Sequence, residues 1–191
     1  LLSTGEGVYG LDLEGCCTIC NPACLRLLGY SDPSQLLGEN MHRLIHHSHR
    51  DGSAYPIQEC SISQAFLSGT GTHVENEVLW RADGTSFDAE YRAQPVFRNG
   101  EIVGGVVSFS DISERRRSEK YQRVDEKRLS MLLELNQQAA LLSEKELCDR
   151  ALDIAVEVTD SVIGYLHMVN EDQETIKLVT WNQATLAMCT A

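Results

Sequence analysis

The residues best suited to chemistry in this chain are histidines and a cysteine gathered in one polar tract. They are His42, His46, His47, His49 and, across a loop, Cys60. Neutral imidazoles and a thiolate are ligands that zinc and haem iron accept. We therefore take His46, His47, His49 and Cys60 as candidate metal ligands. Two alternatives stay open: the histidines cap the preceding helix at its C-terminus, or they form a pH-sensitive loop.

A second group of thiols lies nearer the N-terminus, at Cys16, Cys17, Cys20 and Cys24. Cys17 and Cys20 have the spacing of a metal or redox pair. In a regular strand, however, residues an odd number apart point to opposite faces, so we expect these thiols to fill space in a core. The odd total of seven cysteines disfavours a disulfide framework and fits a reducing compartment, hence a cytoplasmic location.

The elements that must position these residues follow from changes in hydrophobic period. Residues 9–20 form a hairpin, capped short helices occupy 22–45 and 59–68, and alternating strands fill 73–109 around Asp83-Gly84 and Asn99-Gly100 turns. This order predicts an α+β fold, a five-stranded antiparallel sheet with short helices on one face. Six apolar residues either line a pocket in it or simply build its core: Tyr9, Leu28, Ile45, Phe66, Tyr91 and Phe109.

Five motifs in this order resemble those of a PAS domain. They are Gly10-Leu11-Asp12-Leu13-Glu14-Gly15, Asn21-Pro22-Ala23, Leu27-Leu28-Gly29-Tyr30, Arg81-Ala82-Asp83-Gly84-Thr85 and Asp111-Ile112-Ser113-Glu114-Arg115. The resemblance covers residues 1–112 as a domain and implies a sensory or interaction module with a pocket between sheet and helices. It also implies that Asp111, Ile112, Glu114 and Arg115 couple the last strand to an output helix. The Asn-Cys-Arg tract of light-sensing members is missing, so no flavin site is assigned.

Residues 113–145 are expected to form a signalling helix, because they contain neither proline nor glycine. Apolar residues three or four apart mark a seam, which predicts a parallel coiled-coil homodimer: Tyr121, Val124, Leu132, Leu135, Ala139 and Leu142. Arg128 interrupts the seam. The alternative is a surface helix lying on its own sheet. Residues 146–191 resemble the opening of a GAF domain, a partial α/β segment that is incomplete here.

Charge and missing motifs limit the function classes. The formal net charge of −12 argues against nucleic acid as a partner. No window has the roughly 20 apolar residues of a membrane span. No phosphate loop, zinc-protease motif or nucleophile elbow is present, so we expect no enzyme in these residues.

We therefore predict a regulatory module of a longer signalling protein, such as a sensor histidine kinase of a two-component system. It would pass ligand, redox or partner sensing to a C-terminal output domain in the same polypeptide. Its cofactor stays open between haem, flavin, a metal ion and none, and a small-molecule ligand is a candidate signal. The alternatives are a haem- or metal-binding redox sensor that uses the histidine-rich loop, and a dimerisation scaffold with no ligand.

Overall fold

The computed structural model describes residues 5–182 and residue 185. The chain divides into two units, the first ending at Arg116 and the second beginning at Arg117. Each unit is described by itself.

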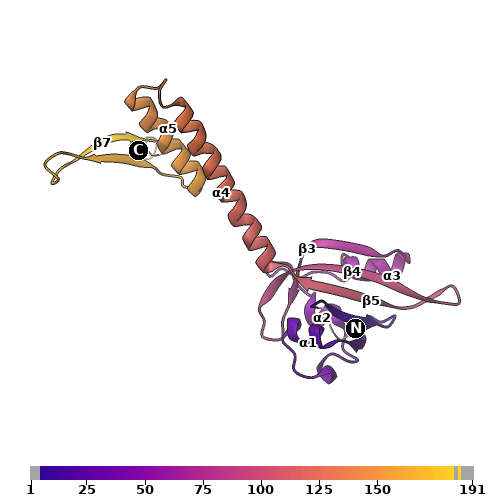
Figure 1. The fold of residues 1–191 in the computed structure, drawn as a ribbon. Helices are drawn as coiled ribbons and strands as arrows, with labels where there is room; N and C mark the ends of the chain where they lie inside the picture. Colours follow the sequence, from indigo (N-terminus) through magenta and orange to yellow (C-terminus); the bar gives the residue numbers. More distant parts are fainter. Residues whose placement is uncertain (1–4, 183–184, 186–191) are drawn as a thin grey trace. The chain divides into compact units, whose positions relative to one another are not determined.

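The first unit is built on one antiparallel sheet (Figure 1). Its strands are β1 (Gly7–Leu11), β2 (Cys17–Cys20), β3 (Thr72–Trp80), β4 (Ser86–Arg98) and β5 (Glu101–Asp111). Their order across the sheet is β2-β1-β5-β4-β3. The predicted α+β class and five-stranded antiparallel sheet are therefore confirmed.

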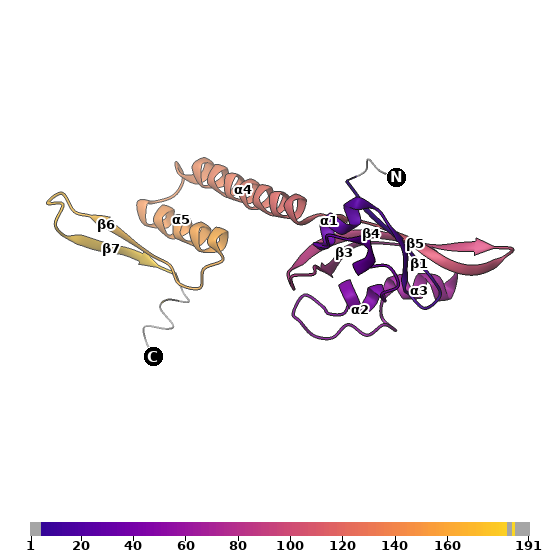
Figure 2. The ribbon, with the colours of Figure 1, turned by 90° about the horizontal axis from the view of Figure 1, so that it is seen from below.

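Short helices join β2 to β3, and Figure 2 shows α2 and α3 beside the sheet. They are α1 (Pro22–Leu28), the 3-10 helix η1 (Pro33–Gln35), α2 (Met41–Ile45) and α3 (Ser61–Ser68). The predicted caps are present: Asn21 Oδ1 accepts from Cys24 N at 2.7 Å, and Asp32 and Gln35 form a capping box. One core fills the space between these helices and a face of the sheet that carries Tyr9, Tyr91 and Phe109.

A register shift in the first hairpin corrects the expectation that Cys17 and Cys20 face opposite ways. Cys20 lies opposite Tyr9 and Cys17 opposite Leu11, with the shift falling between Gly10 and Leu11. The extra residue on β2 offsets the odd spacing, so both cysteines share the face of Tyr9 and Leu11. The predicted argument from regular alternation was wrong because a bulge breaks that alternation.

The second unit contains two helices and a two-stranded sheet. Helix α4 (Ser113–Gln138) begins in the first unit, and α5 (Glu144–Thr159), β6 (Tyr165–Val169) and β7 (Ile176–Trp181) follow it. The predicted helix of residues 113–145 thus ends early, because Ser143 and Glu146 form a capping box that starts a new helix. Ion pairs Lys127–Glu157 and Arg150–Glu134, both at 3.0 Å, join α4 to α5. The GAF resemblance stays a prediction, and residues 183–184 and 186–191 lie outside the described part.

Across the described residues, no helix is both long and apolar enough to cross a bilayer.

Candidate functional site

A cavity of about 330 Å³ lies between β1 and helices α2 and α3. Its apolar wall includes Leu11, Met41 and Ile62, and its polar wall includes three residues of the histidine-rich tract, His42, His46 and Cys60. Two of the six predicted pocket residues, Tyr9 and Phe66, line it. The other four pack in the core and are not part of this lining: Leu28, Ile45, Tyr91 and Phe109. The pocket is therefore displaced from its expected place toward α2 and α3.

His46, Cys60 and Glu77 form a buried chain of polar groups at this wall. His46 Nδ1 lies 3.3 Å from Cys60 Sγ, and His46 Nε2 lies 3.3 Å from Glu77 Oε1. Both His46 and Cys60 are only 1% exposed. The second oxygen of Glu77 accepts a hydrogen bond from the Tyr91 hydroxyl. A thiol, an imidazole and a carboxylate in this order can share protons within a site that water barely reaches.

Glu77 enters the site because of a second register shift, in β3. Val74 lies opposite Tyr91 and Glu77 opposite Ala89, so β3 carries one residue more than β4 between these pairs. Tyr91 and Ala89 face the core, and the bulge therefore places Glu77 on the core face as well. The regular alternation expected within residues 73–109 assumes an uninterrupted strand, and it gives no signal for Glu77.

The three groups shift each other's proton affinity. Burial alone lowers the pKa of His46, but Cys60 and Glu77 outweigh it and raise this pKa to about 9. Burial raises the pKa of Cys60, and the His46 contact reverses that effect and holds the thiol below its ordinary value. Burial also raises the pKa of Glu77, yet His46 and then Tyr91 lower it to about 2. At neutral pH the cluster therefore favours an imidazolium at His46 and a carboxylate at Glu77, and Cys60 ionises more readily than an ordinary thiol.

His42 completes the polar wall from the first turn of α2. Its Nε2 lies 2.9 Å from the Tyr55 carbonyl oxygen, and burial lowers its pKa. Its Nδ1 is buried and has no hydrogen-bond partner among the described residues. His42, His46 and Cys60 each offer one ligand atom, and these three atoms all lie within 4.8 Å of one another.

The structure places His47 and His49 elsewhere. The His47 ring stacks on Trp80 with 5.4 Å between ring centroids, and its Nδ1 lies 2.7 Å from Ser48 Oγ. The His49 ring packs on Tyr55 at 4.5 Å. Of the predicted ligand set, only His46 and Cys60 are brought together, and His42 joins them. The correction has a simple cause: α2 ends at Ile45, and the loop beyond it turns His47 away from the cavity.

The N-terminal thiols, Cys17 of β2 and Cys24 of α1, have a different environment. Burial raises the pKa of Cys17 to about 11 and raises the pKa of Cys24 further. Cys17 Sγ donates to the Ile19 carbonyl at 3.3 Å. These groups are neutral thiols, which is the state that a space-filling role requires.

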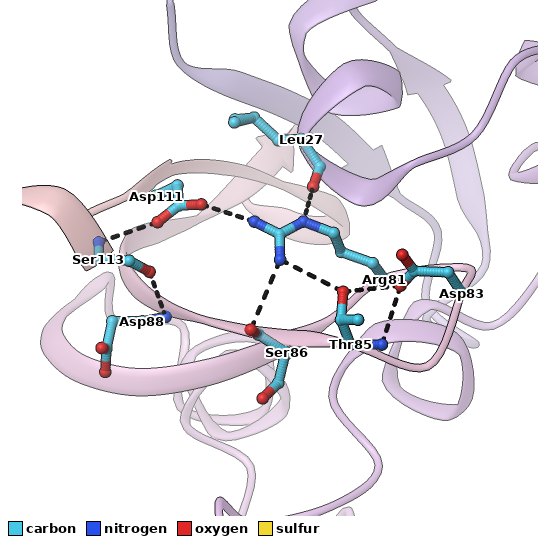
Figure 3. A network of polar contacts seen from close by, with 8 residues as sticks. All are labelled: Leu27, Arg81, Asp83, Thr85, Ser86, Asp88, Asp111 and Ser113. Carbon is cyan, nitrogen blue, oxygen red and sulfur yellow. Dashed lines mark hydrogen bonds and ion pairs between the residues drawn. The ribbon is translucent and has the colours of Figure 1, made fainter.

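Of the predicted coupling residues, Asp111 lies where the sheet meets the start of α4 (Figure 3). Arg81 Nη2 donates to Asp111 Oδ2 at 2.7 Å, and Arg81 Nε donates to the Leu27 carbonyl at 3.1 Å. Asp111 Oδ1 accepts from Ser113 N at 2.9 Å. One carboxylate therefore joins α1, the β3–β4 turn and the first residue of α4.

The other predicted coupling residues differ in their contacts. Ile112 is buried, 4% exposed, and its N–H donates to the Asp88 carbonyl at 2.8 Å. Arg115 pairs with Glu90 at 3.0 Å. Glu114 is exposed in the first turn of α4, where an acid suits the helix dipole.

Asp88 is a coupling residue that the sequence did not indicate. Its N–H donates to Ser113 Oγ at 3.1 Å, and its carboxylate accepts from Arg116 Nη1 of α4 at 2.9 Å. The same carboxylate oxygen pairs with Arg50, which lies in the loop between α2 and α3. Asp88 thus connects the loop that carries the polar wall to the first turn of α4.

Comparisons with known proteins agree with this fold. A family model described as a PAS domain matches residues 5–114 of the 191-residue chain, and the chain belongs to that family. Over 106 residues it is 35% identical to the methyl sulfide methyltransferase-associated sensor of Methanosarcina acetivorans. This match covers 56% of the chain but only 10% of that relative, so the chain spans about a tenth of the curated relative's length.

A solved structure shows the same fold. An RNA-binding light-oxygen-voltage receptor matches with 22% identity and a TM-score of 0.51, over 65% of this chain and 34% of that one. A PAS domain from Colwellia psychrerythraea matches with 22% identity and a TM-score of 0.46, over 58% of this chain and 89% of that one. The predicted PAS resemblance is confirmed.

Proposed function

We propose that this chain is the sensing module of a larger signal-transduction protein and that its signal enters at the cavity and leaves through α4. The observation that carries this proposal is the shared carboxylate of Asp88. Arg50 of the cavity loop and Arg116 of α4 both pair with it. A shift of the loop therefore changes how firmly the first turn of α4 is held.

The mechanism is a shift between two populations of this contact. A signal in the cavity needs to favour one state by only about 1 to 3 kcal/mol to give a useful response. Asp111 and Arg81 serve as the fixed point, because their ion pair joins the helix start to the β3–β4 turn and Arg81 also binds the Leu27 carbonyl of α1. We assign the pocket to a small molecule, and the relative's name as a sensor supports a sensing role.

The larger context is part of the proposal. We place the module in a cytoplasmic sensor histidine kinase or similar two-component protein, with its output domain C-terminal to α4. The six cysteines in the described part are free, as a reducing compartment requires. We also propose that α4 pairs two chains, because Tyr121 and Val124 on the seam are 67% and 42% exposed in one chain. A sedimentation experiment that gives only monomer would remove the dimer.

The coupling is tested by hydrogen exchange at the amides of the first turn of α4. Phe66→Ala enlarges the cavity from α3, and we expect it to change the opening free energy of that turn by about 0.5 to 2 kcal/mol. In an Asp88→Ala background the same cavity change should have no effect on the turn. Glu101→Ala, at the exposed start of β5, is the control for losing a carboxylate.

Asp111→Ala gives a second readout. It should loosen the first turn of α4 and cost the domain about 1 kcal/mol, since the lost ion pair is about three-quarters buried. Strand amides in β4 and β5 should remain protected.

Equal responses to Phe66→Ala with and without Asp88 would refute the proposed route.

A further inference from the structure

We propose that His42, His46 and Cys60 bind a divalent metal ion of the Zn²⁺ class at the wall of the cavity, with one coordination position open to that cavity. This inference deepens the proposed function, because it rests on the cavity as the entry point and names what the cavity holds. Two imidazoles and a thiolate form a donor set of borderline softness, which suits Zn²⁺ and its substitute Co²⁺.

The spacing of the three donor atoms fits one ion. Bonds of about 2.0 to 2.1 Å to nitrogen and about 2.3 Å to sulfur put tetrahedral ligand atoms roughly 3.3 to 3.6 Å apart. Cys60 Sγ and His46 Nδ1 are already 3.3 Å apart. All three ligand atoms lie within 4.8 Å of one another, so a contraction of about one ångström at His42 would close the set.

The His42 imidazole is oriented as metal ligands usually are, and the second nitrogen of His46 has a carboxylate nearby. A metal-bound histidine commonly donates its other ring N–H to a carbonyl or carboxylate, which fixes the ring. His42 Nε2 faces the Tyr55 carbonyl at 2.9 Å. His46 Nε2 lies 3.3 Å from Glu77 Oε1, an ion-pair distance without the alignment of a hydrogen bond among the described residues. A carbonyl oxygen only accepts, so the hydrogen of His42 sits on Nε2 and a lone pair is left on Nδ1.

The buried Nδ1 of His42 is the observation that the cluster does not otherwise explain. It has no hydrogen-bond partner among the described residues. Burying such a group without a partner is unfavourable, so it calls for a ligand. A metal ion would satisfy it, and the thiolate together with Glu77 would balance the two positive charges.

The open position follows from the number of ligands. Within the described part of the chain, the group contains three residues that can ligate, whereas structural zinc sites are closed by four. All three residues line the cavity. The fourth position therefore takes water or a small molecule that enters the cavity. Replacement of the water by that molecule would be the signal that the module senses.

Cobalt titration of the chelator-treated whole chain tests the site. We expect one Co²⁺ per chain, a sulfur-to-cobalt charge-transfer band, tetrahedral visible bands, and displacement by Zn²⁺. Cys60→Ser should remove the charge-transfer band. Glu77→Gln should weaken binding about 10- to 100-fold by loosening His46, and His42→Ala should weaken it more.

Matched controls come from the same chain. His47→Ala removes a histidine of the same loop, and Cys24→Ala removes a thiol from the same core; neither should change cobalt affinity. His42→Ala keeps the test informative if Cys60 variants do not fold, because His42 lies only partly buried at the start of α2.

Several outcomes would overturn the metal site. They are a folded wild type with no sulfur-to-cobalt band, binding that survives His42→Ala but is lost in His47→Ala, and haem uptake with a Soret band in place of a directly bound ion. Exchange at α4 separates this inference from the proposed function. If Phe66→Ala still reaches α4 through Asp88 while cobalt does not bind, only the metal site fails.

Discussion

Cys24 and Cys60 are both buried cysteines of the same domain, yet their surroundings give them opposite chemistry. Cys24 is 0% exposed and Cys60 is 1% exposed. Burial raises the pKa of Cys24, and the neighbouring thiols Cys20 and Cys17 raise it further. Cys60 has the His46 imidazole at 3.3 Å, and that contact lowers its pKa despite the burial. The partner, and not the degree of burial, decides whether a core thiol is available for chemistry.

The difference extends one step further, to Glu77. A protonated imidazole in a core is costly unless a carboxylate balances it. Glu77 supplies that charge from β3, whereas the pKa values of Cys17 and Cys24 are raised by burial and by neighbouring thiols. Two kinds of experiment therefore test the contrast between Cys60 and the N-terminal thiols. One removes the charged partners of Cys60, and the other looks for reactivity in the thiols of the hairpin.

The largest effect is expected from Glu77→Ala. This change leaves His46 buried with its cation unbalanced on one side, and removing one partner of a buried pair costs roughly 3 to 5 kcal/mol. We place Glu77 at about 3 kcal/mol, the lower end, because its side chain is 19% exposed. Urea unfolding of the two proteins measures the difference.

Glu75→Ala is the matched control two residues earlier in β3. Its side chain is 71% exposed and its contact to His73 is 3.8 Å, so its loss should change stability by no more than about 0.5 kcal/mol. Equal costs for the two glutamates would mean that the His46 charge is not held by Glu77.

The sheet, its helices and the start of α4 were predictable because each has a local signal. Asn21, Asp32 and the Asp83-Gly84 turn act within a few residues, and the structure confirms their elements. The site was only partly predictable. Glu77 faces the core, and Cys17 shares a face with Cys20, because a bulge depends on how a strand pairs with its partner, which the alternation within one strand does not encode.

The sequence also did not show whether His42 or His47 lies beside His46 and Cys60, because tertiary structure decides this. His42 and His47 are five apart, and nothing local says where α2 ends or which ring meets Cys60. Arg50 and Asp88 lie 38 residues apart, so their pairing follows from tertiary structure alone. Composition marked the right loop, but the fold decided which of its histidines and arginines face the site.

A second, smaller effect is expected in thiol alkylation. In chelator-treated protein, a small reagent that enters the cavity should modify Cys60 at least about tenfold faster than Cys24 at neutral pH, because only the thiolate reacts. The lowered pKa of Cys60 sets the sign: its rate should rise with pH and level off below the ordinary thiol range. Peptide mass spectrometry measures both sites.

His46→Gln should move this profile in a known direction. Without the imidazolium, burial dominates, so the pKa of Cys60 rises and the alkylation rate falls at neutral pH. Cys24 should not respond. A Cys60 profile that is the same in both proteins would show that His46 does not activate the thiol.

The smallest effects are expected for the N-terminal thiols, Cys24 of α1 and Cys20 of the β1–β2 hairpin. Cys24→Ala should cost about 1 kcal/mol for the lost sulfur in a closed core, and Cys20→Ala, at a partly exposed position, less than about 0.5 kcal/mol. Because the bulge puts Cys17 and Cys20 on one face, mild oxidation is the decisive condition. If these thiols only fill space, the mass of their peptide stays unchanged under oxidant. A mass loss of two hydrogens that Cys20→Ala abolishes would mean that Cys17 and Cys20 form a disulfide. The hairpin would then also hold reactive thiols, and it would differ from Cys60 in the kind of reaction and not in being inert.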